Sequence, residues 1–61
     1  MKVVFYRDAN REWRWRLKAR NGRYLADSGE GYKRKGACAK SWWSVRDNIR
    51  GFHVSEEYAD D

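Results

Sequence analysis

Hydrophobic and charged residues alternate from Glu12 to Ala19, which is the period of a β-strand with one buried face and one face in water. Asn21-Gly22 follows this stretch, and both residues suit the positive φ angles of a two-residue hairpin turn. A second short run then extends from Arg23 to Ala26. The pattern therefore predicts a β-hairpin with strands at residues 12–19 and 23–26.

A two-residue turn fixes which residues of the hairpin lie opposite each other. The predicted pairs are Arg20 with Arg23, Ala19 with Tyr24, Lys18 with Leu25, Leu17 with Ala26, and Arg16 with Asp27. This register predicts one apolar and one basic face. The apolar face holds Trp13, Trp15, Leu17, Ala19, Tyr24 and Ala26, with Val3 and Phe5 from a preceding strand. The basic face holds Arg14, Arg16, Lys18, Arg20 and Arg23, with Asp27 as a partial counter-charge.

Two further elements are predicted on either side of the hairpin. The β-branched and aromatic run at residues 3–6 is typical of a strand. Ala37 or Cys38, Trp42, Val45 and Ile49 recur at helical spacing and predict a helix of three to four turns that ends before Gly51. Residues 52–54 form a brief apolar segment that either adds a strand or packs under the helix. We therefore expect an α+β fold, a three-stranded antiparallel β-sheet (β-meander) followed by one α-helix packed on the sheet.

The length of 61 residues allows one small domain, whose hydrophobic core alone only just offsets the entropy of folding. Cys38 is the only cysteine and His53 the only histidine, so neither a disulfide nor a structural zinc set is available. An aromatic core and self-association are the remaining sources of stability, and we expect both.

The single thiol, together with the lack of a secretory signal or a long apolar run, indicates a cytoplasmic protein with no membrane partner.

Charge is unevenly distributed along the chain. Residues 1–54 carry all 14 Lys and Arg residues against five acids, whereas residues 55–61 carry four acids and no base. We therefore expect a single domain at residues 1–54 and an acidic, flexible C-terminal tail at residues 55–61 that frays or folds back weakly onto basic neighbours.

Several stretches of the chain resemble the YegP-like family of small bacterial and archaeal proteins. They are Phe5-Tyr6-x-Asp8, the run RWRLKA from Arg14, Asn21-Gly22, the run SGEGY from Ser28, and Ser44-Val45-Arg46. The resemblance covers residues 3–48. It implies a hairpin with a third strand followed by a helix, and two such units, from one chain or two, packing together. It implies no activity.

The chain departs from the family pattern at two places. Lys33-Arg34-Lys35 stands where members usually have small hydroxyl residues, and Trp42 stands where they usually have an aliphatic one. Both departures favour a specialised binding protein.

The predicted basic face is a candidate binding surface. Positive charge on an open sheet attracts phosphates, and interleaved aromatic rings allow bases to stack. The aromatic residues of this chain are expected mainly on the opposite face, so the predicted surface lacks a stacking platform. The alternative is a solvated face that keeps the protein soluble and protects the sheet edges.

The connection between the hairpin and the helix is a second candidate site. Gly29 and Gly31 allow backbone N–H groups to converge, and Lys33, Arg34 and Lys35 lie close by at a helix N-terminus. The spacing matches neither the Walker nor the dinucleotide-binding motif. A plain strand-to-helix turn is the alternative.

The tryptophans are a candidate dimer interface. Trp42 and Trp43 point about 100° apart on a helix, so both cannot face one core. Their aromatic area, added to that of the sheet, exceeds what so small a monomer covers, and exposed Trp marks interfaces. The candidate residues are Trp13, Trp15, Trp42 and Trp43. Alternatively, Phe52 and Tyr58 fold back over them.

Catalysis finds no support in the sequence. Cys38 lies on the apolar stripe of the helix, and Glu30 is a lone carboxylate between two glycines. We expect no enzyme activity, catalytic residue, metal site or cofactor.

Our hypothesis is a small binding module that forms a homodimer and engages an acidic protein partner through its basic face, as would suit a phage or mobile-element accessory protein. Binding of single-stranded or duplex nucleic acid through the same surface is the alternative.

Overall fold

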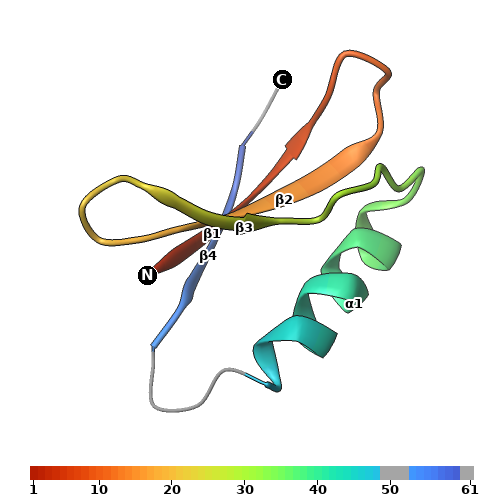
Figure 1. Cartoon of the computed structure of the whole chain (residues 1–61). Coiled ribbons are helices and arrows are strands. Elements are labelled where there is room, and N and C mark those ends of the chain that lie inside the picture. Colours follow the sequence, from red (N-terminus) through yellow and green to blue (C-terminus); the bar gives the residue numbers. More distant parts are fainter. Residues whose placement is uncertain (49–52, 60–61) are drawn as a thin grey trace.

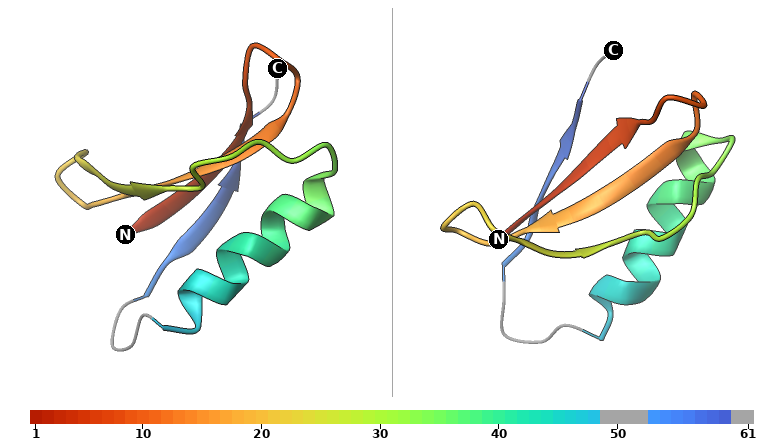
Figure 2. Two further views of the ribbon diagram at one scale, coloured as in Figure 1. Left: turned by 45° about the vertical axis from the view of Figure 1, so that its right-hand side comes forward. Right: turned by 45° about the horizontal axis from the view of Figure 1, so that its top comes forward.

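The computed structural model describes residues 1–48 and 53–59. Its elements are the strands β1 (Lys2–Arg7), β2 (Trp13–Lys18) and β3 (Tyr24–Asp27), the helix α1 (Lys35–Arg46) and the strand β4 (Ser55–Tyr58). The strands form a single sheet in the order β3-β2-β1-β4. The helix covers one face and leaves the other open (Figures 1 and 2). The predicted α+β fold with one helix packed on a sheet is confirmed.

The sheet has four strands, and the prediction of three was wrong. Ser55–Tyr58, which the sequence placed in the acidic tail, form β4 and pair in parallel with β1. The Tyr58 ring stacks on Phe5 with ring centroids 4.7 Å apart, and Lys2 Nζ lies 3.4 Å from a carboxylate oxygen of Glu57. The acidic residues of this strand thus find cationic neighbours at the sheet edge. A strand of this kind lacks the hydrophobic alternation by which strands are recognised.

The turn between β2 and β3 is one residue longer than predicted. The Gly22 amide donates to the Ala19 carbonyl at 3.0 Å, and the Ala19 amide donates to the Arg23 carbonyl at 2.7 Å. Gly22 has a φ of +92°, and the Asn21 side chain accepts a hydrogen bond from the Arg23 amide at 3.1 Å. These features define a three-residue loop in which glycine alone takes the left-handed conformation.

The longer turn changes the register of the hairpin. Tyr24 lies opposite Lys18, and a β-bulge at Leu25 then restores the predicted pairing. Leu17–Ala26 and Arg16–Asp27 are therefore confirmed. The predicted pairs Arg20–Arg23, Ala19–Tyr24 and Lys18–Leu25 were wrong. As a consequence, Tyr24 moves from the predicted apolar face to the opposite side of the sheet.

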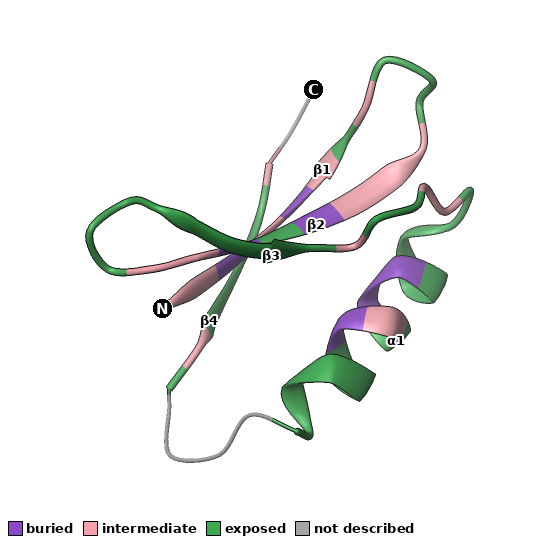
Figure 3. Ribbon diagram, viewed as in Figure 1, coloured by how far each residue is buried: buried purple, intermediate pink, exposed green. Residues whose placement is uncertain are grey.

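The core lies between the helix and the two central strands (Figure 3). Trp15 and Trp42 meet edge to face in it, with centroids 5.2 Å apart, and the Trp15 indole N–H donates to the Ser41 hydroxyl at 2.8 Å. The buried residues are Val3, Phe5, Trp15, Leu17, Cys38, Ala39 and Trp42. The assignment of indoles and aliphatic residues to the inner face and of arginines to the outer face is thus confirmed for β2, and Val3 and Phe5 of β1 lie on the inner face as predicted.

The helix occupies most of the predicted segment. Cys38 and Trp42 of the predicted apolar stripe are buried, whereas Val45 is exposed. The predicted positions Ile49, Gly51 and residue 52 lie outside the described residues. The helix therefore contributes a short buried stripe that reaches the centre of the sheet.

Candidate functional site

The face of the sheet opposite α1, which we call the outer face, carries the basic residues of β2. Arg14, Arg16 and Lys18 alternate with the inward-facing Trp15 and Leu17 along the strand. Arg20 and Arg23, which were predicted for the same face, lie on the exposed loop that follows. This loop projects from the end of the sheet opposite the β1–β2 turn (Figure 1).

Arg14 is held in the structure by an acid. Its Nε donates to Asp8 Oδ2 at 2.5 Å, and the other carboxylate oxygen of Asp8 accepts the amides of Asn10 and Glu12 at 2.8 and 3.0 Å. The hydrogen bond from Arg14 is the main reason that the pKa of Asp8 lies below its usual value. Arg14 therefore stabilises the β1–β2 turn and contributes little net charge to the outer face.

The four other predicted basic residues form no ion pair with a described carboxylate. Among residues 1–48 and 53–59, ion pairs join carboxylates to Lys2, Arg14 and Arg46, and none involves the four. We call the four together with two neighbouring tyrosines the hairpin patch. Its members are Arg16, Lys18, Arg20, Arg23, Tyr6 and Tyr24.

The two tyrosines of the patch lie on either side of Arg16. The Arg16 guanidinium lies 4.3 Å from the Tyr6 ring centroid, and its Nε donates to the Tyr6 hydroxyl at 3.0 Å. The same guanidinium lies 5.2 Å from the Tyr24 ring centroid. Lys18 Nζ lies 5.6 Å from that same centroid. Hydrogen bonding to Tyr6, and then to Tyr24, raises the pKa of Arg16. Phe5 and Trp15 lie on the opposite face, as expected, but the outer face also holds two aromatic rings beside its cations.

The position of Tyr6 on the outer face could be predicted from the sequence, whereas that of Tyr24 could not. Val3 and Phe5 were assigned to the inner face, and alternation then places Tyr6 on the outer face. The signal for Tyr6 was therefore present. Tyr24 reaches the outer face only through the three-residue turn and the bulge, which Asn21-Gly22 does not specify.

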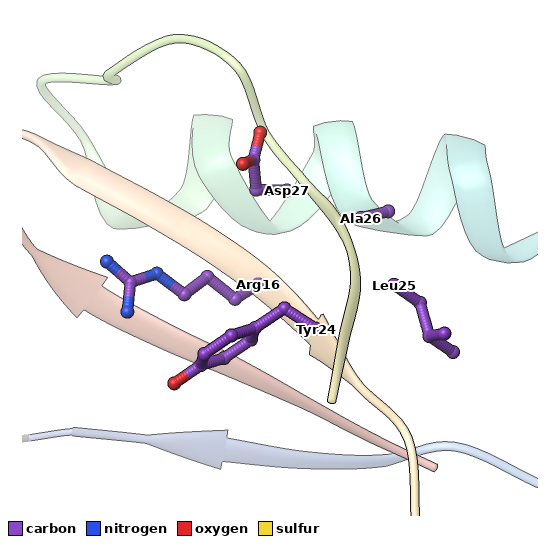
Figure 4. Close-up of a pocket in the computed structure, with 5 residues that line it drawn as sticks. All are labelled: Arg16, Tyr24, Leu25, Ala26 and Asp27. Carbon is purple, nitrogen blue, oxygen red and sulfur yellow. The ribbon is translucent and has the colours of Figure 1, made fainter. Parts of the chain in front are cut away.

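A hollow of about 390 Å³ opens beside Tyr24, between β2 and β3. Figure 4 shows Arg16 and Tyr24 projecting side by side from the two strands, on the side of the sheet away from the helix. Leu25, Ala26 and Asp27 complete the lining. The hollow thus combines a guanidinium, an aromatic ring, apolar groups and a carboxylate.

The loop proposed as an anion site has the contacts of a strand-to-helix turn. Gly29, at a φ of +74°, donates its amide to Asp27 Oδ1 at 2.9 Å, and the Tyr32 amide donates to the Trp13 carbonyl at 2.8 Å. Two of the amides that an anion nest would use are therefore engaged. A Cβ on Gly31 would lie 2.5 Å from a side-chain oxygen of Glu12, so glycine is required there for space.

The basic residues of this loop do not converge on one point. Lys33 and Arg34 are exposed, and Arg34 precedes the helix without a side-chain capping bond. Lys35 Nζ lies over the rings of Tyr58 and Trp13, at 4.3 and 5.4 Å. These positions match the plain turn that the sequence left as the alternative.

The four tryptophans proposed for a dimer interface separate into two groups. Trp15 and Trp42 are buried in the core and are not part of the surface. Trp13 is half-buried, and Trp43 is 41% exposed, with its indole N–H donating to Glu56 at 3.0 Å. Tyr58 packs on Phe5. Only Trp13 and Trp43 thus remain for contact with another molecule.

Cys38 and the acidic side chains were the remaining candidates for reactive or metal-binding groups. Cys38 is fully buried, and burial raises the pKa of its thiol to about 11, which keeps it protonated at neutral pH. Among the described residues, no three His, Cys, Asp or Glu side chains are grouped so as to hold a metal ion. In the part of the chain that the structure describes, no helix has the length and apolar character needed to cross a bilayer.

Comparison with known proteins gives a consistent result. Residues 8–56 match the family described as Domain of unknown function (DUF1508). The chain is 43% identical over 47 residues to a UPF0339 protein of Methanosarcina acetivorans, covering 77% of this chain and 79% of that one. It is 43% identical over 55 residues to a UPF0339 protein of Treponema denticola, covering 90% and 93%. The solution structure of a protein from Haloferax volcanii matches with a TM-score of 0.72 and 40% identity, over 85% of this chain and 87% of that one.

Proposed function

The chain belongs to the YegP-like family, also described as DUF1508, and since that description carries no activity, we propose a function from the geometry of its own outer face. The protein is a non-enzymatic binding module, and its hairpin patch binds nucleic acid.

The distribution of charge on the outer face carries this proposal. Asp8 neutralises Arg14 on one side of the sheet, and Glu57 neutralises Lys2 near the edge formed by β4. The four cations of the hairpin patch have no carboxylate partner among the described residues, and all four belong to β2 and the loop after it. A cluster of cations on an open sheet attracts phosphates and releases their counterions.

The tyrosines favour nucleic acid over the acidic protein partner that the sequence first suggested. An acidic protein surface requires only the cations, whereas nucleic acid also offers planar bases. Tyr24 is 59% exposed although the cations of Arg16 and Lys18 both lie near its ring. Exposed rings within a basic patch are typical of nucleic-acid-binding sheets.

Salt dependence of oligonucleotide binding tests the proposal. Titration by fluorescence anisotropy should show binding of an oligonucleotide of about 12 nucleotides at about 50 mM salt, with a slope of about −3 in log K against log salt for four phosphate contacts. Replacing Lys18, Arg20 and Arg23 by glutamine should reduce this slope by about 2.

A matched variant controls for net charge. Lys33, Arg34 and Lys40 are exposed residues outside the hairpin patch, and replacing them by glutamine removes the same three charges. This variant should bind nearly as well as the unchanged protein. Equal losses in the two triple variants, or no binding at low salt, would contradict the proposal and leave an acidic protein as the partner to test.

A further inference from the structure

The row of planar groups formed by Tyr6, Arg16 and Tyr24 spans three adjacent strands of the outer face. Neighbouring strands lie about 4.8 Å apart, and each of these strands contributes one planar group. The Arg16 guanidinium lies between the rings, at 4.3 and 5.2 Å from their centroids. Guanidinium and tyrosine surfaces both stack on nucleobases. The outer face therefore holds two aromatic rings and a guanidinium within its cationic patch, and Tyr24 is the more exposed of the two rings.

The hollow beside Tyr24 differs in chemistry from the loop that carries the cations. Its lining includes the exposed side chain of Leu25, the methyl group of Ala26 and the carboxylate of Asp27. A carboxylate repels phosphate but accepts hydrogen bonds from the exocyclic amino groups of bases. The cations of Lys18, Arg20 and Arg23 lie on the adjoining strand end and loop. A base in the hollow and its phosphates on the loop thus match the local chemistry.

Single-stranded and duplex nucleic acid differ in whether the faces of their bases are accessible to a protein ring. In a duplex the faces of the bases are covered by their neighbours, so a ring on a sheet surface cannot stack on them. In a single strand the bases are free to turn outward. We infer that the ligand of the hairpin patch is single-stranded nucleic acid whose bases stack on Tyr24, an inference that rests on the proposed function.

Two oligonucleotides of equal charge test the inference on the unchanged protein. One contains about 12 deoxycytidines, and the other has the same sugar-phosphate backbone without bases. Stacking of one base should make the first bind roughly 10-fold more tightly than the second. A duplex of the same length should bind more weakly than the single strand.

Variants of Tyr24 locate the effect. Tyr24→Ala should weaken binding of the deoxycytidine strand roughly 10-fold and leave binding of the abasic strand unchanged. Tyr24→Phe keeps the ring and should bind like the unchanged protein. Circular dichroism should show that both variants fold, because Tyr24 contributes nothing to the buried core. If Tyr24→Ala does not fold, the comparison of strands on the unchanged protein decides the question.

The outcomes separate the two proposals. Equal affinity for the deoxycytidine and abasic strands, or for single strand and duplex, would overturn base stacking while leaving phosphate binding by the hairpin patch intact. Failure of both strands to bind at low salt would overturn the proposed function itself.

Discussion

Arg16 contacts both tyrosines of the outer face and thereby links β1, β2 and β3. It donates to the Tyr6 hydroxyl and lies against the rings of both Tyr6 and Tyr24. A long, flexible side chain is thereby held in one position before any ligand arrives, which lowers the entropy that binding would otherwise cost. Lysine at this position would keep the charge but lose the planar contact, since the guanidinium stacks and the ammonium does not.

The acid that holds Arg14 makes the stability of the protein depend on pH. The pKa of Asp8 is depressed in the folded state, so its contribution is present above the unfolded value of about 3.9 and is lost as pH falls through the lower folded value. Asp8→Asn should lower the melting temperature at pH 7 and weaken the loss of stability below about pH 4. Thermal unfolding by circular dichroism across this range measures both effects. If the variant loses stability below about pH 4 as steeply as the unchanged protein, other carboxylates are the main cause of that loss.

Gly31 and Gly36 differ in whether the structure has room for a side chain at their positions. A Cβ on Gly31 would lie 2.7 Å from Glu12 Cβ, so Gly31→Ala should destabilise the fold by about 1–3 kcal/mol through overpacking. Gly36 has open space around it and lies in the first turn of α1, so Gly36→Ala should be neutral or stabilise by about 0.5 kcal/mol. Urea unfolding of the two variants gives both values. Similar losses in both would mean that the contact with Glu12 is unimportant.

At the level of elements, β4 contributes through its aromatic residue more than through its charges. Tyr58 stacks on the fully buried Phe5, whereas Lys2 and Glu57 form an ion pair in which both side chains are exposed. Aromatic stacking with its buried area stabilises appreciably, whereas an exposed pair adds little. The strand thus protects one end of the core and completes the sheet.

A pair of substitutions in β4 tests this difference. Tyr58→Ala should cost about 1–3 kcal/mol, since it removes the ring that covers Phe5. Glu57→Gln should change stability by less than about 1 kcal/mol. Urea unfolding followed by tryptophan fluorescence measures both. A larger cost for Glu57→Gln than for Tyr58→Ala would show that the strand is held by charge.

The hairpin shows how far sequence reasoning reaches. The two faces of β2 were predictable because burial of Trp15 and Leu17 forces a period of two on the whole strand. The turn was not, because Asn-Gly suits both a two-residue turn and the last positions of a three-residue loop. That single extra residue moved Tyr24 to the outer face. The position most important for the candidate site was therefore the one that local sequence could not assign.

The missed strand has a different physical origin. Ser55-Glu56-Glu57-Tyr58 lacks an apolar face, so its pairing depends on partners far away in sequence. Trp43 and Arg46 at the end of α1 both contact Glu56, and Lys2 contacts Glu57. Contacts with residues so distant along the chain leave no periodic signal within the segment itself.

For the whole molecule, the small core is the dominant feature. Seven residues are buried among those described, and every residue of β3 and β4 is exposed. Domains of this size commonly gain stability by association, and we still expect the homodimer predicted from the sequence. Trp43 is the indole most available to it. Light scattering at micromolar concentration should give twice the chain mass of 7.4 kDa. A folded species at the single-chain mass would contradict this expectation.

The parallel pairing of β1 with β4 has a consequence for biosynthesis. β1 leaves the ribosome first, yet it gains its second neighbour only after Ser55–Tyr58 have been translated and have emerged from the exit tunnel. Until then Phe5 has no ring stacked on it from β4. We therefore expect the nascent chain to complete its native structure after translation of this segment, by a slow closing contact between residues distant along the polypeptide.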